Sequence, residues 1–182
     1  MGWDSLLDLV PKLIGKAWNY HRRPILGIYF DAAETYHTRT IVENNSTGFF
    51  CHLMVRNKGE QTAKNCRARL IGVFHQEPNG EFVRHPGFVN PAILKWAHEP
   101  DFNPKDIEDL PRRLDLCYTD QSVLHSLIFF TPIRPNGNQT IFPPGTYRVR
   151  IRVDADNASR AEGVFIVRYN DVWNQVRIDP DG

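Results

Sequence analysis

The feature that most constrains the fold is a strict alternation of apolar and charged residues in the last third of the chain. Between residues 147 and 153, apolar side chains occupy every second position and arginines occupy the positions between them. The apolar residues are Tyr147, Val149, Ile151 and Val153, and the arginines are Arg148, Arg150 and Arg152. Successive side chains point to opposite faces in a β-strand. The pattern therefore predicts a strand with one buried and one solvated face.

Segments with this period follow one another from residue 25 onward. Each is short, rich in β-branched and aromatic residues, and bounded by turn formers. They lie at residues 25–31, 38–43, 49–56, 66–70, 114–118, 126–131, 147–153, 164–167 and 173–178. Roughly seven to nine short strands, with a turn signal about every 8–12 residues, are typical of an antiparallel sandwich or barrel. No helical segment separates them, which argues against a parallel α/β sheet.

Two of these segments are predicted to pair as a hairpin. Apolar rows on residues 51–55 and 66–70 flank the turn formers of residues 57–60, in which Gly59 can take a positive φ. Residues 78–109 interrupt the pattern with several prolines and glycines. They are interpreted as an irregular insertion that carries one short edge strand at residues 92–97.

The first 23 residues follow a helical period instead. Over residues 3–20, apolar residues recur at i, i+3, i+4 and i+7, which predicts an amphipathic helix that is kinked at Pro11 or begins near it. Its apolar stripe comprises Trp3, Leu6, Leu7, Val10, Leu13, Ile14 and Trp18. A stripe of this size needs a cover. The alternatives are the chain's own sandwich, a second copy of the chain, another protein, and a membrane surface. The domain organisation is thus a helix at 1–23 and a β-sandwich at 24–182.

Two stretches resemble bacterial immunoglobulin-like domains of the CARDB type. Residues 55–59 (Val-Arg-Asn-Lys-Gly), followed by residues 63–66 (Ala-Lys-Asn-Cys), resemble the V-x-N-x-G…A-x-N pattern of that group. Residues 144–153 are similar to its penultimate strand, pG-x-Y-x-v-x-i-x-v. The resemblance implies a bacterial, immunoglobulin-like sandwich of two sheets over about residues 25–178. Its motifs consist of turns and strand alternation, so it brings no catalytic residue.

Composition narrows the class of function. The chain has 182 residues, with 22 Lys and Arg against 21 Asp and Glu, so it lacks the broad positive field of a dedicated nucleic-acid binder. Its three cysteines, Cys51, Cys66 and Cys117, show no CxxC spacing, which favours free thiols and a cytoplasmic location. Neither a positively charged leader nor a membrane-spanning apolar run is present in the sequence.

Catalytic and metal-binding motifs are missing. The sequence contains no P-loop, no dinucleotide-binding glycine motif and no G-x-S-x-G. Cys51 and His52 are adjacent on a strand, so they point to opposite faces, and His52 is expected at the surface or between the layers. His75, His85 and His98 flank the insertion and would form a metal site only by converging in space. We therefore expect no catalytic residue, no cofactor and no metal.

The arginines of residues 148–152 have two interpretations. With Arg67 and Arg69 on a neighbouring strand they would form a basic patch for an anionic partner. Alternatively, the face is solvated and offset by acids on adjacent strands, which the near-zero net charge favours.

The function predicted is a non-enzymatic protein-interaction or accessory module. It would bind a protein partner or a second copy of itself through the N-terminal helix, the basic sheet face or both. Contact with a membrane surface is a further option, and nucleic acid is not expected. The alternative is a sandwich that binds a carbohydrate or nucleotide through exposed aromatic residues around the insertion: Phe88, Trp96, Phe102 and Tyr118. An enzyme that uses the His- and Asp-rich insertion is the weakest of the three.

Overall fold

The computed structural model describes residues 22–41, 45–132 and 138–181, with only the backbone described for residues 34, 35, 37–40 and 124. The predicted N-terminal helix lies outside these ranges. The described strands are β1 (Leu26–Tyr29), β2 (Tyr36–Ile41), β3 (Ser46–Asn57), β4 (Ala63–Gln76), β5 (Phe82–Arg84), β6 (Ala92–Ile93), β7 (Lys95–Trp96), β8 (Lys105–Ile107), β9 (Arg112–Asp120), β10 (Val123–Phe129), β11 (Ile141–Phe142), β12 (Gly145–Asp154), β13 (Ala161–Tyr169) and β14 (Val176–Pro180). One helical turn, α2 (Ala32–Thr35), follows β1.

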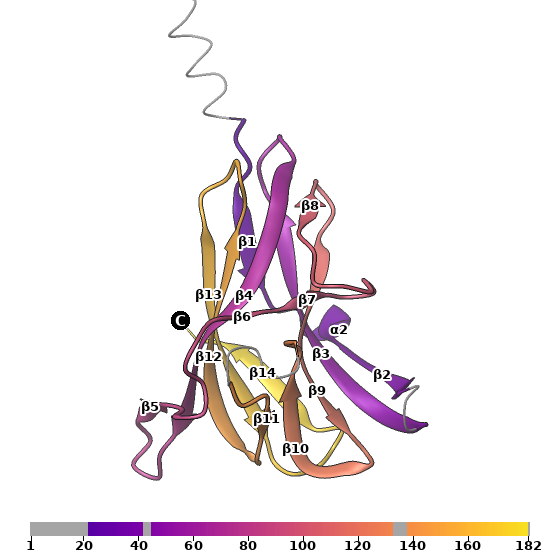
Figure 1. Ribbon diagram of the computed structural model, residues 1–182, viewed down its shortest axis with the longest axis vertical. Helices are drawn as coiled ribbons and strands as arrows, with labels where there is room; N and C mark the ends of the chain where they lie inside the picture. Colours follow the sequence, from indigo (N-terminus) through magenta and orange to yellow (C-terminus); the bar gives the residue numbers. More distant parts are fainter. Residues whose placement is uncertain (1–21, 42–44, 133–137, 182) are drawn as a thin grey trace, which may run out of the picture.

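The strands form two antiparallel sheets that face each other (Figure 1). The β3 sheet has the order β1-β3-β9-β10-β11, with β2 also paired to β3 and β7 paired to β9. The β12 sheet has the order β14-β13-β12-β4-β5, with β6 and β8 also paired to β4. The prediction of a mainly β chain with an antiparallel two-sheet architecture is confirmed.

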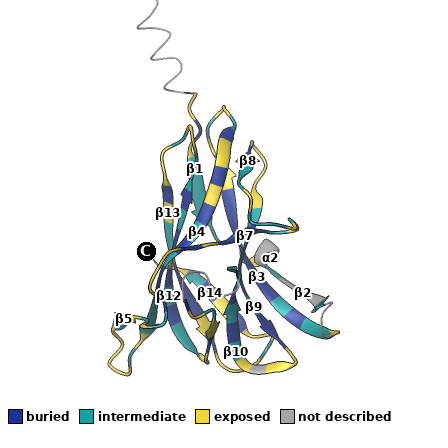
Figure 2. Ribbon diagram, viewed as in Figure 1, coloured by how far each residue is buried: buried dark blue, intermediate teal, exposed yellow. Residues whose placement is uncertain are grey.

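The core lies between the sheets and consists of the apolar rows that the sequence marks. On β12 the apolar residues from Tyr147 to Val153 are buried, whereas the arginines between them reach solvent. On β3, Cys51, Leu53 and Val55 are fully buried in the same core. Figure 2 shows buried and exposed residues alternating along β4 in the same way. Alternation thus assigns each side chain to a face, as expected for strands with one buried face.

The predicted hairpin between the rows at 51–55 and 66–70 is wrong. β3 pairs with β9, and β4 pairs with β12, so the two rows belong to different sheets and face each other across the core. Alternation defines which face of a strand is buried, but it does not define the neighbouring strand. Two apolar rows are buried equally well edge to edge or face to face.

The connection between β3 and β4 is held by Asn57, which is 3% exposed. Its Oδ1 accepts hydrogen bonds from the backbone N–H groups of Ile25 and Gly59, both at 3.0 Å, and its Nδ2 donates to the carbonyl of Gln61 at 2.6 Å. Gly59 does not take the expected positive φ. A Cβ there would lie 2.1 Å from the carbonyl oxygen of Arg23, so close backbone approach requires this glycine.

The insertion carries the chain from one sheet to the other. Ile93 of β6 pairs with Arg69 of β4, and Trp96 of β7 pairs with Leu114 of β9. Leu94 lies between these two short strands and is 1% exposed. The single edge strand predicted at residues 92–97 is therefore two strands in different sheets, because the apolar run crosses from one sheet to the other with Leu94 buried between them.

Tyr147 fixes the start of β12. Its hydroxyl donates a hydrogen bond to the carbonyl of Pro143 at 2.7 Å, four residues upstream. Its ring packs edge-on to Phe142 with centroids 5.5 Å apart. Burial raises the pKa of Tyr147 to about 12.

Candidate functional site

The outward side of the β12 sheet carries a surface that we name the arginine face. It comprises Arg67, Arg69, Arg148, Arg150, Arg152, Arg168 and Arg177, with the carboxylates Asp154, Glu162, Asp179 and Asp181. The register places Arg152 opposite both Arg69 of β4 and Glu162 of β13. The sequence-predicted residues Arg148, Arg150 and Arg152 therefore do share a face with Arg67 and Arg69. These residues bring seven guanidinium groups together with four carboxylates, and Arg84 of β5 adds another guanidinium at the edge of the same side.

Carboxylates on this face are each engaged by arginine. Glu162 accepts from Arg152 at 2.9 Å and lies 3.5 Å from Arg150. The Arg152 hydrogen bond, aided by the nearby charges of Arg152 and Arg150, lowers the pKa of Glu162. Asp154 lies 2.6 Å from Arg69 Nη1, and Asp181 lies 2.6 Å from Arg148 Nε.

The remaining arginines are less well matched. Asp179 serves both Arg168 and Arg177. Arg67 is exposed, and it makes no ion pair with any residue that the structure describes. Acidic residues therefore offset part, but not all, of the arginine charge on this face, as the second interpretation of the sequence expects in part.

At the centre of the arginine face the Phe74 ring lies across a glycine. Gly72 of β4 lies opposite Arg150, and a Cβ on Gly72 would come within 3.0 Å of the Phe74 ring. At one edge the guanidinium carbon of Arg148 lies 4.1 Å above the centroid of the Phe82 ring. A basic surface with aromatic side chains is suited to contact with another macromolecule.

The other predicted partner-binding residues form the N-terminal stripe. Trp3, Leu6, Leu7, Val10, Leu13, Ile14 and Trp18 all lie outside the described residues. Their docking surface stays a prediction.

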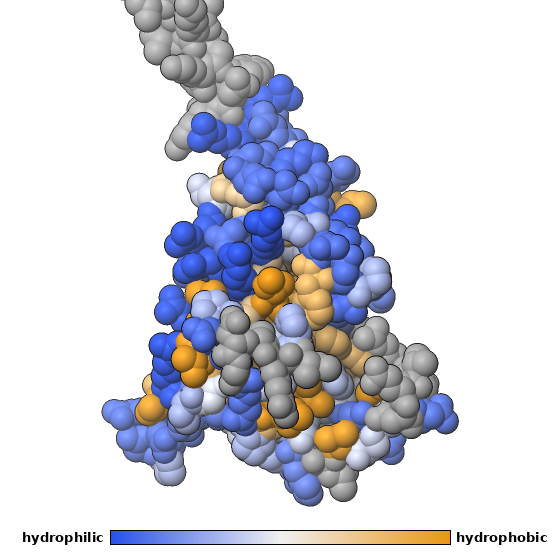
Figure 3. Space-filling view, viewed as in Figure 1, coloured by the Kyte–Doolittle hydropathy of each residue, from blue (hydrophilic) through white to orange (hydrophobic). Residues whose placement is uncertain are grey.

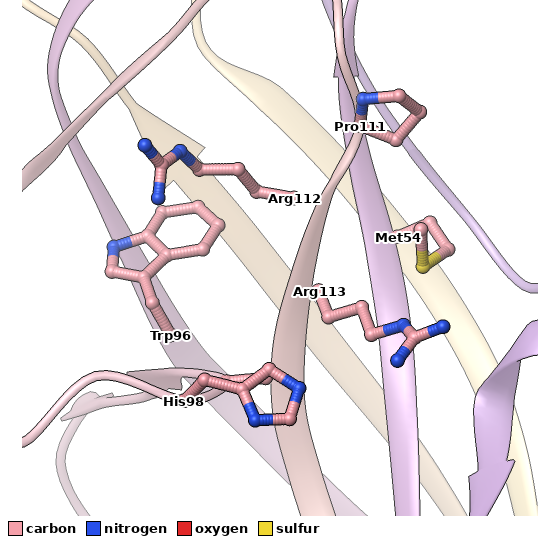
Figure 4. A pocket seen from close by; sticks show the side chains of 7 residues that line it. Met54, Trp96, His98, Pro111, Arg112 and Arg113 are labelled. Carbon is pink, nitrogen blue, oxygen red and sulfur yellow. The ribbon is translucent and has the colours of Figure 1, made fainter.

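A second site, which we name the Arg113 cavity, lies at the β3 sheet (Figure 4). Its volume is about 380 Å³, and its lining comprises Met54, Trp96, Ala97, His98, Pro111, Arg112 and Arg113. Met54 and Arg113 are cross-strand neighbours of β3 and β9, and the N–H of Ala97 donates to the carbonyl of Arg113 at 2.9 Å. Two arginines and a histidine line this cavity, and no acidic residue is among the described lining residues.

Arg112 and Arg113 have different surroundings. They leave β9 on opposite sides (Figure 4), as neighbours in a strand do. Arg112 donates to the carbonyl of Asp106 at 3.0 Å and lies 3.4 Å from Glu99. Within the described ranges Arg113 makes no side-chain hydrogen bond or ion pair, although its side chain is half-buried.

His98 stands at the rim in a strained backbone conformation. Its φ is 65°, in the left-handed region, inside a turn closed by the N–H of Glu99 donating to the carbonyl of Trp96 at 3.2 Å. Glycine or asparagine is the usual residue at such a position. The sequence alone does not reveal this site. No local pattern indicates the positive φ of His98, or that Arg113 makes no ion pair with the described residues.

His52 is buried on the outward side of the β3 sheet, which corrects the expectation that it lies at the surface or between the sheets. Its Nδ1 lies 2.7 Å from Oδ1 of Asp115, and the two side chains are only 1% and 3% exposed. A register step between Cys51 and His52 brings Asp115 opposite His52. Cys51 and His52 do point to opposite faces, as predicted.

The three histidines that flank the insertion do not converge. His75 and His85 pack with ring centroids 5.5 Å apart, whereas His98 lines the Arg113 cavity. His85 Nδ1 accepts a hydrogen bond from the N–H of Gly87 at 3.1 Å, so the neutral ring carries its proton on Nε2. In that tautomer neither nitrogen is available as a metal ligand. Across the described residues no group of three or more His, Cys, Asp or Glu is placed to hold a metal ion.

The cysteines are enclosed. Cys51 and Cys117 lie directly opposite each other on β3 and β9, and both are 0% exposed. Both thiols therefore belong to the core. Burial raises the pKa of the Cys51 thiol, and burial also raises that of Cys66 to about 11. Thiols of this kind are poor nucleophiles.

The aromatic residues expected to stack on a ligand are not an exposed set. Phe88 and Trp96 are each 2% exposed and belong to the core, whereas Phe102 and Tyr118 are half-buried, and Tyr118 stacks on Phe50 at 5.3 Å. Apolar residues do reach the surface (Figure 3), but the exposed ones near the insertion are aliphatic: Val83, Val89, Ile93 and Leu110. Aliphatic side chains offer no π-face to a sugar or a base.

No helix in the described part of the chain is long and apolar enough to cross a membrane. Comparison of the chain with protein-family models, curated proteins and solved structures finds no match.

Proposed function

We propose that this chain is a non-enzymatic interaction module that binds an acidic protein surface through the arginine face. The observation that carries the proposal is the excess of guanidinium groups over carboxylates on one sheet face of a chain whose net charge is only +1. Each guanidinium has five N–H donors, so an arginine that already contacts one carboxylate can bind a second. Arginine is also enriched in protein interfaces.

A protein partner suits this face better than a phosphate backbone. Glu162 and Asp179 lie among the arginines and would repel a continuous row of phosphates. An acidic protein surface can place its carboxylates over Arg67 and Arg150 and avoid these two acids. The three free cysteines support a reducing compartment such as the cytoplasm.

We further infer that the sandwich is immunoglobulin-like. The neighbours β1-β3-β9-β7 and β13-β12-β4-β5 contain the A-B-E-D and G-F-C orders of that fold, and β2, β6, β8, β10, β11 and β14 are further strands of the two sheets. Tyr147 supports the same inference, because a tyrosine near the start of strand F that hydrogen-bonds to the backbone a few residues upstream is a hallmark of such domains. In these domains function resides in surfaces and loops, so the topology is compatible with a binding role and does not specify one.

The proposal is tested with a variant and a control of equal charge change. Arg67→Glu with Arg150→Glu reverses two exposed positions of the arginine face. Arg56→Glu with Lys58→Glu reverses two exposed positions near the end of β3, in the other sheet. A short poly-glutamate peptide is titrated into each protein, with amide chemical shifts as the readout.

We expect amides of β4, β12 and β13 to shift in the wild type and the control, with binding weakened about tenfold or more in the arginine-face variant. The affinity should fall as salt is added. Equal peptide binding by both variants would remove the proposal. Double-stranded DNA, titrated in parallel at the same salt concentration, should bind more weakly than the peptide.

A further inference from the structure

The Arg113 cavity holds a cationic group whose nearby acids are already engaged. Asp115 lies two residues along the same side of β9, but its Oδ1 is 2.7 Å from Nδ1 of His52. Glu99 lies 2.8 Å from Lys105 and 3.4 Å from Arg112. Arg113 is therefore left without a carboxylate partner in the described part of the chain.

Other arginines that make no ion pair with described residues differ from Arg113 in their exposure to water. Arg56 and Arg67 also make no ion pair with described residues, but both are exposed to water and line none of the cavities described. Water screens and solvates such groups at little cost. Arg113 is half-buried over the apolar side chain of Met54, which is 3% exposed. A partly desolvated guanidinium gains more from a bound anion than a solvated one does.

We propose that the Arg113 cavity binds a small oxyanion, the carboxylate or phosphate group of a soluble ligand, with Arg113 as its main ligand and His98 at its rim. The planar guanidinium matches two oxygens of either group at once. The left-handed φ of 65° at His98 places a histidine on the cavity where glycine would be unstrained. The site lies on the opposite sheet from the arginine face and does not depend on the function proposed for that face.

The test uses the full chain and three salts at equal ionic strength: sodium phosphate, sodium succinate and sodium chloride. Thermal unfolding is followed as each concentration is raised. We expect phosphate or succinate to raise the Tm by several degrees with saturation in the millimolar range, beyond any effect of chloride. A response to phosphate alone, to succinate alone or to both identifies which oxyanion the cavity accepts. No saturable rise with either salt would overturn the proposal.

Variants locate the binding. Arg113→Gln should weaken the response about tenfold or more, whereas Arg56→Gln, an exposed arginine of the same sheet, should keep it. Arg67→Glu with Arg150→Glu should also keep it, which separates this site from the arginine face. An unchanged response of Arg113→Gln would reject the assignment.

If Arg113→Gln does not fold, the location of anion binding is tested in the wild type. Amide chemical shifts are then recorded with the salt that stabilises the protein. Shifts confined to residues 96–99 and 111–114 support the cavity. Shifts confined to β4, β12 and β13 would assign the anion to the arginine face and overturn the proposal.

Discussion

Arg152 and Arg69 lie directly opposite each other on adjacent strands, and each is held by a carboxylate: Arg152 by Glu162 of β13, and Arg69 by Asp154 at the end of β12. Arg152 bonds to Glu162 on β13 at 2.9 Å, and Arg69 bonds to Asp154 at 2.6 Å. Like charges opposite each other on neighbouring strands are destabilising unless acids compensate them. The two acids therefore allow the sheet to present a row of guanidinium groups.

Replacing Glu162 by glutamine should destabilise the fold by about 0.5–1 kcal/mol, because the pair is partly exposed and salt-screened. The pKa of Glu162 is lowered in the folded state, so its contribution is present at neutral pH and disappears as the pH falls through that lowered pKa. Urea unfolding at low and high salt provides the measurement. Glu108→Gln, an exposed acid without an ion pair among the described residues, is the control and should change little.

The pH dependence of stability below neutrality should report on His85. Burial, followed by the charge of nearby His75, lowers the pKa of His85 from its ordinary value of 6.5. The unfolded chain therefore binds this proton more readily than the folded chain does. Stability is complete above pH 6.5 and decreases as the pH falls from there through the folded-state pKa.

Protonation of His85 would also replace the acceptor at Nδ1 by a donor that faces the N–H of Gly87. His85→Leu should flatten the loss of urea stability as the pH falls below 6.5. The exposed His125→Gln serves as the control and should retain the loss. An equally steep loss in His85→Leu would contradict this origin of the pH dependence.

His98→Gly should stabilise the protein although it removes a side chain. A left-handed conformation costs a non-glycine residue about 1–2 kcal/mol, and this strain disappears in the glycine variant. The greater freedom of glycine in the unfolded chain destabilises the variant by about 0.5–1 kcal/mol. The net gain of about 0.5–1 kcal/mol should raise the Tm by a few degrees. Ala97→Gly, one residue earlier and without a positive φ, should lower it. If His98→Gly is more stable than the wild type but binds the oxyanion more weakly, then His98 contributes to binding despite its strained backbone conformation.

Alternation predicts faces well and neighbours poorly in this chain. The arginines and apolar residues of β12 lie on the faces that the sequence predicts. The predicted hairpin is wrong because the apolar rows on β3 and β4 need only share a core to be buried. Their actual partners, β9 and β12, are distant in sequence. The Arg113 cavity had no sequence signal for a related reason: its lining joins β3, the turn after β7 and the start of β9, and only folding brings these together.

The thiols should be inaccessible until the chain unfolds. Cys51, Cys66 and Cys117 are all buried, and burial raises the pKa of Cys51 and Cys66, so little thiolate is present at neutral pH. A chromogenic disulfide reagent should react with less than one thiol per chain in native buffer and with all three in urea. Rapid reaction of the native protein would mean that the core around β3 and β9 opens far more often than its packing implies.

Tyr147→Phe should isolate the hydrogen bond that fixes the start of β12. The ring remains to pack on Phe142, and only the donation to the carbonyl of Pro143 is lost, so we expect a cost of about 1–2 kcal/mol. Tyr169→Phe, another core tyrosine, is the comparison for loss of a hydroxyl.

Since the pKa of Tyr147 is raised to about 12, the folded state holds this proton more tightly than the unfolded chain does. Its contribution is therefore complete below pH 10 and declines as the pH rises from 10 toward 12. The alkaline loss of stability in urea unfolding should be smaller in Tyr147→Phe than in the wild type. An unchanged loss would mean that Tyr36, whose pKa burial also raises to about 12, dominates the alkaline transition.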